Sequence, residues 1–425
     1  MATSTHGTTT NAAPDGTDVP SFTPVVVGGD IGSYALAREI HEAYGLTSVC
    51  LVPIPIAAIK HSKIMEHREI PSIEAHDLRA GLERIAAEDP GRKVLVLTNS
   101  EPVIAAYNEV KDQLPANVVA PIPSAEVVDL VSHKDSFARL CAQNGLDTPR
   151  QEVVELAGSD AIAPTELPFP VVAKPAYSPE YSHFINVLGF QKVYFMERQE
   201  QLDRLWKDLR EAGFAGTFLV QELIGGDDTY MDSVTIYVAS DGTPTLFSGA
   251  NVLLEDHSPA MLGNPVAMIT TSMREVWEKS ARMLSQVGYR GYANFDVKRD
   301  PTDGRKVFLE VNPRIGRNSY YVAAAGENPM RHCVEDLVLG RPRELAYVER
   351  EILYTLVPLG LLRHYIRDER LLARTNRLID AHLVFDPQRY DHDRGLRRML
   401  AVETTEQNQR RKFAQYYPDA TDSSF

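Results

Sequence analysis

After about twenty polar residues, the chain begins with short apolar segments that are separated by segments of helical spacing. Strand-length and helix-length patterns alternate in the order 23–29, 33–44, 48–52, 72–88, 93–97 and 102–113. Strands that alternate with helices in this way are typical of a parallel sheet covered by helices. The pattern therefore predicts an N-terminal α/β domain over residues 21–128, preceded by a disordered tail over residues 1–20.

From residue 129 onward the pattern changes, because hairpin-like strand pairs appear among the helices. Helices are predicted at 129–145, 199–212 and 271–287, and strands at 170–174, 193–195, 218–224, 233–238 and 245–248. This mixture predicts an α+β domain over residues 129–340, in which a segment at about 170–225 forms a lid. Helical segments beyond it predict a C-terminal helical extension over residues 341–425.

Within the α+β domain, the segment from residue 294 to residue 317 carries the clearest candidate chemistry. Two apolar strands, 294–299 and 306–311, are joined by a turn that contains proline and glycine. Asp296 and Glu310 lie at equal distances from the centre of this turn, so we expect them to be opposite each other on one face. Asn312 joins that face by strand alternation. Two carboxylates and an amide oxygen suit Mg²⁺.

An edge hairpin with solvated charges is the plain alternative to a metal site. Apolar residues alternate with the acids, however, so the carboxylates come from a half-buried sheet, and a buried carboxylate pair needs a cation. Arg314 and Arg317 follow the hairpin directly and offer bidentate donors for phosphate or carboxylate. Lys174 closes an otherwise apolar strand, where its ammonium must find an anion or reach solvent. The loop at 176–184 is rich in hydroxyl groups, which favours a segment able to fold over phosphate.

Composition and charge narrow the range of partners. The 425 residues carry a formal net charge of −14, which argues against nucleic acid or an anionic membrane as the main partner. The three cysteines are far apart and lack metal-type spacing, as is typical of reduced thiols in a cytosol. The first twenty residues have no signal-peptide pattern, and no apolar run is long enough to span a bilayer. We therefore expect a soluble, cytoplasmic protein.

Five motifs occur in the order and approximate spacing of the ATP-grasp superfamily. They are Lys134, Lys174, QELI at 221–224, FDVKRD at 295–300 and FLEVNPR at 308–314. The resemblance implies an α/β protein with the ATP-grasp fold, an N-terminal Rossmann-like domain before it, and the use of ATP with Mg²⁺ or Mn²⁺. It implies ATP contacts from Lys134, Lys174 and the backbone of Glu222 and Leu223, with Ser178 on the loop as a further candidate. Asp228 takes the place of the ribose-binding acid, and Asp227 is its alternative.

The same resemblance assigns the remaining roles at the hairpin. Asp296, Glu310 and Asn312 match the magnesium ligands, and Arg314 matches the arginine that steadies the transferred phosphoryl group. Lys174 and Arg317 complete the expected catalytic set. Phosphoryl transfer needs metal ions and cationic donors around the γ-phosphate more than covalent help from the protein, so these residue types agree with the implied chemistry.

Longer segments resemble the D-aspartate ligases of cell-wall synthesis. They are GGDIGSYALAREIHEAYG at 28–45, KPAYSPEY at 174–181, QELIGGDD at 221–228, and the stretch from NFDVK at 294 to NSYYVAAAG at 326. In that family ATP phosphorylates the β-carboxylate of D-aspartate. A lysine side-chain amine of the peptidoglycan stem peptide then attacks the acylphosphate, with release of ADP and phosphate. The resemblance thus implies an amino acid and an amine acceptor as partners, and a UDP-linked peptidoglycan precursor as one form of the acceptor.

Five residues are candidate contacts to these substrates: Asp30, Ser33, Asn318, Ser319 and Tyr321. A helix N-cap explains Asp30 equally well. Two other functions remain open: a ligase that joins an L-amino acid to a small peptide, amine or metabolite, and a nucleotide-binding module without turnover. The complete set of lysines, acids and Arg314 speaks against the second. The oligomeric state is also open, with a homodimer among the options.

Overall fold

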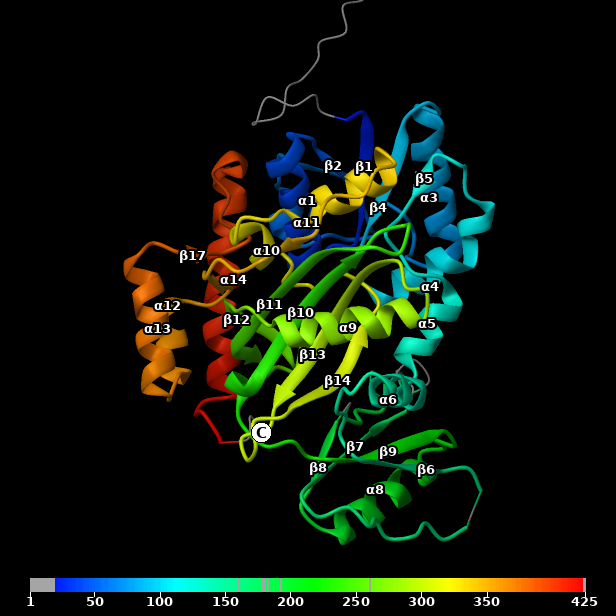
Figure 1. Cartoon of the computed structure of the whole chain (residues 1–425), viewed down its shortest axis with the longest axis vertical. Coiled ribbons are helices and arrows are strands. Elements are labelled where there is room, and N and C mark those ends of the chain that lie inside the picture. Colours follow the sequence, from blue (N-terminus) through cyan, green and yellow to red (C-terminus); the bar gives the residue numbers. More distant parts are fainter. Residues whose placement is uncertain are drawn as a thin grey trace, which may run out of the picture.

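The computed structural model describes residues 20–158, 160–176, 181, 183–185, 187–191, 193–259 and 261–422. Within these ranges the strands form three sheets of five, eight and four strands. Figure 1 shows them one above the other along the long axis, with the N-terminal sheet at the top and the four-stranded sheet at the bottom. No helix in the described ranges has the length and apolar character needed to cross a membrane.

The N-terminal sheet has the strand order β3-β2-β1-β4-β5, and all its pairings are parallel, as predicted. Its strands are β1 (Phe22–Val27), β2 (Ser48–Leu51), β3 (Met65–Arg68), β4 (Lys93–Leu97) and β5 (Val118–Val119). The helices of this region are α1 (Ile31–Tyr44), α2 (Ala57–Lys60), α3 (Ala75–Glu88), α4 (Glu101–Val110) and α5 (Ala125–Ser132). Alternating side chains of β1 face opposite sides: Val25 and Val27 pack with α3 and α4, and Val26 packs with α1.

The four-stranded sheet has the order β6-β9-β7-β8 and is antiparallel. Its elements are β6 (Gln151–Glu155), β7 (Val171–Pro175), β8 (Tyr194–Met196), β9 (Thr217–Glu222) and the helix α8 (Gln199–Glu211). One face carries an aromatic core in which Tyr181, Trp206 and Phe214 surround Phe218. Three of its strands, β7, β8 and β9, lie within the segment that the sequence predicts as a lid, whereas β6 precedes that segment.

The eight-stranded sheet has the order β14-β13-β10-β11-β12-β16-β17, with β15 beside β11. Its main strands are β10 (Met231–Val238), β11 (Pro244–Asp256), β12 (Asn264–Thr270), β13 (Gly291–Arg299) and β14 (Lys306–Asn312). Three helices pack on it: α9 (Arg274–Gln286), α10 (Tyr320–Ala324) and α11 (Pro329–Cys333). Trp277 of α9 is fully buried against Phe247 of β11, so this sheet has an apolar core on its α9 side.

The single helix predicted over residues 129–145 is wrong. Two helices occupy this region, α5 and α6 (Lys134–Gln143), because His133 between them is extended (φ −75°, ψ 122°). Its carbonyl accepts the hydrogen bond of Phe137 N, so the second helix starts anew at this residue. The break places Lys134 in the first turn of α6, close to β7.

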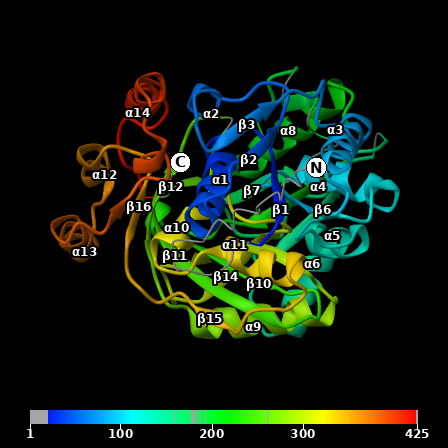
Figure 2. The same cartoon turned by 90° about the horizontal axis from the view of Figure 1, so that it is seen from above.

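The C-terminal segment adds strands as well as helices. Its elements are β15 (Ala346–Tyr347), β16 (Leu353–Thr355), α12 (Leu359–Tyr365), α13 (Glu369–Asp380), β17 (Val384–Phe385) and α14 (Leu396–Tyr416). Seen from above in Figure 2, α12, α13 and α14 stand along one side, next to β12 and β16. Buried Asp393 ties the segment to the N-terminal sheet, because it accepts hydrogen bonds from Tyr34 Oη (2.9 Å), Ser62 Oγ (2.7 Å) and Lys63 N (2.7 Å).

Candidate active site

The hairpin β13–β14 places its two acids opposite each other, as predicted. Asp296 pairs directly with Glu310, and Asn294 pairs with Asn312. Near the turn, however, Val297 pairs with Phe308, so the centre of the turn lies half a residue before the position midway between Asp296 and Glu310. A bulge at Leu309 adds the residue that restores the register at the acids.

The two facing carboxylates suit a divalent cation, although only Asp296 is partly shielded from solvent: Glu310 is exposed, so the predicted buried carboxylate pair is wrong for this residue. Burial of Asp296 and the nearby charge of Glu310 raise the pKa of the Asp296 carboxyl to about 7. Arg314 and a hydrogen bond from Asn312 Nδ2 (3.1 Å) oppose this shift only in part. A bound cation would remove the repulsion and let both carboxylates ionise.

The donor set fits Mg²⁺ on one condition. No trio of histidine, cysteine, aspartate or glutamate side chains in the described ranges is arranged to hold a metal ion. Beside the two carboxylates, the predicted set offers the amide oxygen of Asn312 as its third ligand. In this conformation Asn312 Oδ1 accepts a hydrogen bond from Arg314 Nη2 (3.1 Å), while Nδ2 faces Asp296. Rotation of the amide by 180° turns the oxygen toward Asp296 and completes a set of hard oxygen ligands.

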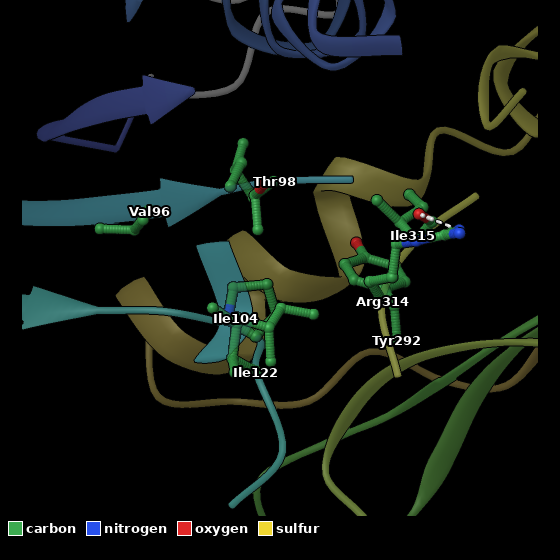
Figure 3. A pocket seen from close by; sticks show the side chains of 9 residues that line it. Val96, Thr98, Ile104, Ile122, Tyr292, Arg314 and Ile315 are labelled. Carbon is green, nitrogen blue, oxygen red and sulfur yellow. Dashed lines mark hydrogen bonds between the residues drawn. The ribbon is translucent and has the colours of Figure 1, made fainter. Parts of the chain in front are cut away.

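Arg314 lies where the hairpin meets the N-terminal sheet. Its Nη2 is 3.3 Å from Glu101 Oε1 at the start of α4. Within the described part of the chain, Arg314 Nε is buried and makes no hydrogen bond. A cavity of about 10 Å³ lies beside the arginine, and Figure 3 shows Thr98 and Ile104 on its opposite wall. This volume is about that of one water-sized probe.

Arg317 connects the site to the first helix of the chain. Its Nε donates to Asp30 Oδ2 over 2.7 Å. Asp30 also caps α1, because its Oδ1 accepts from Ser33 N (2.9 Å) and Ser33 Oγ (3.0 Å). Burial alone would raise the pKa of Asp30, but Arg317 and the bonds from Ser33 outweigh it and hold the pKa below its usual value. The capping role and the contact with the hairpin loop therefore coexist in Asp30.

The other three candidate substrate contacts are deeply buried. Asn318 donates to Met268 Sδ (3.0 Å), and Ser319 donates to the buried carboxylate of Glu39 (2.9 Å). Tyr321 Oη lies 3.0 Å from Ser248 Oγ, and both side chains are inaccessible to solvent. In this conformation the three residues hold the loop after the hairpin in place.

The two lysines converge on the end of β7. Lys134 Nζ donates to the carbonyl of Pro175 over 2.9 Å. Lys174 precedes that proline and is opposite Leu219 of β9 in the register of the sheet. Its side chain is half-buried and points to the face away from Val171 and the apolar core. Ser178 lies outside the described residues.

Glu222 and Leu223, at the end of β9, are close to the tip of the hairpin. The Glu222 carboxylate accepts from Arg150 Nε (3.3 Å) and from Arg305 Nη2 (3.0 Å), and Arg305 belongs to the β13–β14 turn. The backbone N–H of Glu222 bonds to the carbonyl of Arg150. These contacts join the four-stranded sheet to the hairpin at the edge of the site.

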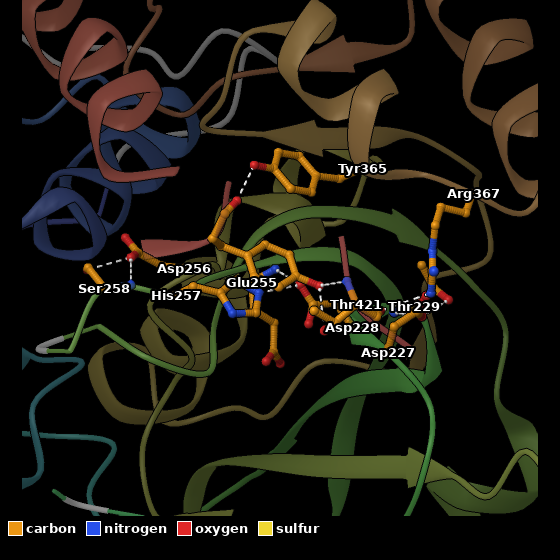
Figure 4. Close-up of polar contacts among 11 residues, drawn as sticks. Asp227, Asp228, Thr229, Glu255, Asp256, His257, Ser258, Tyr365, Arg367 and Thr421 are labelled. Atoms are coloured by element: carbon orange, nitrogen blue, oxygen red, sulfur yellow. Dashed lines mark hydrogen bonds and ion pairs between the residues drawn. The ribbon is translucent and has the colours of Figure 1, made fainter. Parts of the chain in front are cut away.

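Asp228 has partners that the sequence did not indicate. Its Oδ2 accepts from Glu255 N and from His257 Nε2, each at 2.9 Å. Figure 4 shows this cluster, in which the imidazole also stacks on Tyr417 with ring centres 3.6 Å apart. The neighbouring Asp227 accepts from Thr229 and pairs with Arg367 (3.4 Å). Asp228 is thus held directly by residues at the end of β11, and His257 links it to Tyr417 of the C-terminal segment.

Glu255 and Lys298 extend the charged surface between Asp228 and Asp296. Burial and the charge of Asp228 raise the pKa of Glu255 well above its usual value, and Lys298 opposes the shift. Burial also lowers the pKa of Lys298, against the attraction of Glu255. The sequence did contain a signal for Lys298: it is two residues from Asp296 on the same strand, so strand alternation places both side chains on one face. The sequence contained no such signal for Glu255, because two irregularities in the β11–β12 pairing decide which face of the sheet it occupies.

Comparisons with known proteins bear on the fold and on the enzyme class of this chain. No family model matches the chain. Over 410 residues it is 28% identical to the D-aspartate ligase of Enterococcus faecium (strain Aus0004), which covers 93% of this chain and 97% of that protein. Among solved structures, the L-amino acid ligase from Bacillus licheniformis matches with a TM-score of 0.51 and 17% identity over 76% of this chain and 75% of that one. The N5-carboxyaminoimidazole synthetase from Staphylococcus aureus complexed with ADP matches with a TM-score of 0.56 and 11% identity, over 79% and 82%. The chain thus has the ATP-grasp fold.

This result confirms the predicted ATP-grasp fold and the predicted enzyme class, an ATP-dependent ligase that joins a carboxylate to an amine. It also confirms the resemblance to D-aspartate ligases, which extends over nearly the whole chain.

Proposed function

We propose that this ATP-grasp ligase activates the β-carboxylate of D-aspartate and transfers the acyl group to an amine of a peptidoglycan precursor. The observation that carries the proposal is the direct pairing of Asp296 with Glu310 beside Arg314, in a chain that is 28% identical to a D-aspartate ligase along almost its full length. A lysine side chain of the stem peptide, in a UDP-linked precursor, is the proposed acceptor.

The proposed nucleotide site lies between the four-stranded sheet and the hairpin. Lys134 and Lys174 contact the phosphates, and Ser178 on the following loop adds a hydroxyl donor. The backbone of Glu222 and Leu223 holds the adenine edge. Asp228 binds the ribose, with His257 fixing its carboxylate; Asp227 is the weaker candidate because its carboxylate caps a turn. Each of these groups binds or orients ATP, and none needs to react covalently.

Asp296, Glu310 and Asn312 are the proposed ligands of Mg²⁺. Such an ion supplies charge neutralisation between the phosphates and the attacking carboxylate. Arg314 and Lys174 add positive charge where the transferred phosphoryl group passes. Because the chain's net charge is −14, these local cations are what allow two anions to meet in the site.

Arg317, with Asp30, is proposed to orient the amino acid. The guanidinium of Arg317 offers a bidentate surface to a carboxylate, and Asp30 fixes it at 2.7 Å. Asp30 and Ser33 then lie near the amino group, while Asn318, Ser319 and Tyr321 support the loop. We further propose that residues 21–128 and 129–340 act as two domains and that residues 341–425 extend the second of them. The lid at about 170–225 is proposed to exclude water from the acylphosphate.

The test is release of ADP and phosphate with Mg-ATP across a panel of D- and L-amino acids, with hydroxylamine present to trap an acylphosphate. Parallel reactions contain a lysine-type UDP-linked stem peptide. The proposal requires turnover and a hydroxamate with D-aspartate. Preference for an L-amino acid would instead support the ligase of L-amino acids, and ATP binding without turnover under every combination would support a nucleotide-binding module. AMP with pyrophosphate would contradict phosphoryl transfer.

A variant at the hairpin tests the site itself. Glu310→Gln keeps the size and most hydrogen bonds of the side chain but removes its charge. We expect at least a hundredfold loss of ATP turnover with an unchanged circular dichroism spectrum. Full turnover in the folded variant would refute the proposed metal site.

A further inference from the structure

A second cavity lies away from the candidate active site, where α1, α10 and α11 meet. It has a volume of about 310 Å³. In Figure 1 these helices are at the top of the molecule, at the opposite end of the central sheet from β6, β7, β8 and β9. Figure 2, which looks down on that end, shows the three helices together in the middle of the view. The cavity is therefore separate from the nucleotide site proposed above.

The charged residues that line this cavity balance each other. They are two glutamates, Glu42 and Glu327, and two arginines, Arg331 and Arg343. The formal charges of these four side chains cancel, in contrast to the cationic cluster at the active site. A polyanion such as a nucleotide would meet both carboxylates here. A ligand that carries one positive and one negative charge would find a partner for each.

The two carboxylates are held in fixed positions. Glu42 Oε1 accepts from Arg38 Nε (2.8 Å) and from Tyr320 Oη (2.9 Å), and neither of these donors uses Oε2. Glu327 Oε1 is 3.1 Å from Nε2 of the buried His332. The bonds named here all go to Oε1 of each glutamate, and a carboxylate has two acceptor oxygens, so each can accept a hydrogen bond from a further charged donor.

The two arginines that line the cavity lie close to other groups. Arg343 Nη2 lies 3.6 Å from Glu327 Oε1, and its Nη1 pairs with Glu335. Arg331 lies in the first turn of α11, and one of its contacts is a long hydrogen bond of 3.5 Å to the carbonyl of Ala43. Each guanidinium carries five N–H donors in a planar fork that matches a carboxylate.

We propose that this cavity is a second binding site, distinct from the active site, for a small zwitterion of the amino-acid class. The ligand's carboxylate meets Arg331 and Arg343, and its ammonium group meets Glu42 and Glu327. The volume of about 310 Å³ is at the lower end of small-molecule pockets, so it accommodates an amino acid or a dipeptide rather than a nucleotide. This inference does not depend on the donor amino acid proposed for the active site.

Two helices connect the cavity to the active site. The helix α1 has 14 residues and is about 20 Å long, with Asp30 capping its first turn and Glu42 in its last turn. In α10, Tyr320 donates to Glu42 at the cavity. Its neighbour Tyr321 donates to Thr235 Oγ1 (3.2 Å), which in turn donates to Asn294 Oδ1 (3.0 Å) in β13. Binding at Glu42 therefore acts on the elements that hold Asp30 and the metal hairpin, which makes the site a place where an amino acid can regulate the ligase.

Hydrogen–deuterium exchange on the full-length protein locates binding directly. The probes are the twenty L-amino acids, D-alanine and D-aspartate, with acetate and methylamine as single-charge controls. We expect at least one amino acid to protect segments 39–45 and 323–331, and the single-charge probes to protect them less. Protection confined to 30–33 and 314–319, or none at 50 mM of any probe, would overturn the proposal.

Calorimetry with variants then assigns the contacts. Arg331→Gln should raise the dissociation constant at least tenfold, and Glu42→Gln, which keeps an oxygen acceptor for Tyr320, should do the same. The exposed Arg397→Gln on α14 is the matched control and should have no effect. Glu310→Gln should leave this binding intact even if it abolishes turnover, which separates this proposal from the proposed function. Equal affinity in wild type and both cavity variants would refute it.

Discussion

Replacing Asp296 by asparagine should make the metal-free protein more stable, and increasingly so as the pH rises. In the folded state the pKa of Asp296 is raised from 3.8 to about 7, whereas in the unfolded chain it returns to its ordinary value. Between these values the folded state binds more protons than the unfolded state, so the stability of the wild type falls as pH rises. The loss is complete above about pH 7. Asparagine does not titrate and can still accept the hydrogen bond from Asn312.

The size of the effect follows from the shift. A displacement of about three pKa units corresponds to about 4 kcal/mol in total, because one unit is about 1.4 kcal/mol. Part of this stabilisation is already lost at pH 5, because that pH lies above the pKa of Asp296 in the unfolded chain. Linkage between pH 5 and pH 8 leaves on the order of 2 kcal/mol, by which the stability advantage of Asp296→Asn over wild type should grow.

The assay is urea unfolding in EDTA at pH 5 and pH 8, followed by tryptophan fluorescence. Asp303→Asn is the matched control, because Asp303 is an exposed aspartate in the turn of the same hairpin. Its stability should stay within about 0.5 kcal/mol of wild type at both pH values. An advantage of Asp296→Asn that is constant with pH, or that shrinks as pH rises, would refute the idea that burial and the Glu310 charge suppress ionisation. Mg-ATP should stabilise the wild type at pH 8 and leave the variant largely unaffected.

Three further substitutions test other parts of the site. Arg317→Met removes the 2.7 Å ion pair with Asp30 and should raise the KM for the amino acid at least tenfold in steady-state assays; an effect on kcat alone would contradict the orienting role. Tyr417→Ala removes the ring stacked 3.6 Å from His257 and should lower the free energy of unfolding by about 3 kcal/mol while raising the KM for ATP; an unchanged KM would separate the C-terminal segment from the nucleotide site. Lys134→Met should weaken ATP binding at least tenfold in calorimetry, and unchanged affinity would exclude a phosphate contact.

The sequence was most informative where chemistry and periodicity agreed. Alternation of apolar and acidic residues around a turn was enough to predict that Asp296 and Glu310 pair. Strand–helix alternation was likewise enough to predict the parallel N-terminal sheet. In both cases the contact is local or belongs to a recurrent pattern, so a short segment contains the necessary information.

Long-range contacts were beyond this kind of inference. Asp228 bonds to His257 and, through its stacking, depends on Tyr417, which is 189 positions away along the chain. Arg317 meets Asp30 across the interface between two sheets, and no local pattern specifies either partner. The break at His133 was also missed, because the residues on both sides of it favour a helix and only packing decides where one helix ends.

The bulge at Leu309 separates the length of the hairpin loop from the alignment of the acids. Beyond the bulge, toward the turn, the two strands pair in a register one residue out of step with the acids, so changes of loop sequence at residues 300–305 are absorbed before they reach Glu310. Loss of Leu309 would remove the bulge and place Glu310 directly after Phe308, where it would still be opposite Asp296. The pairing of the two acids should therefore survive removal of the bulge residue, whereas an added residue on either side of it would break the pairing.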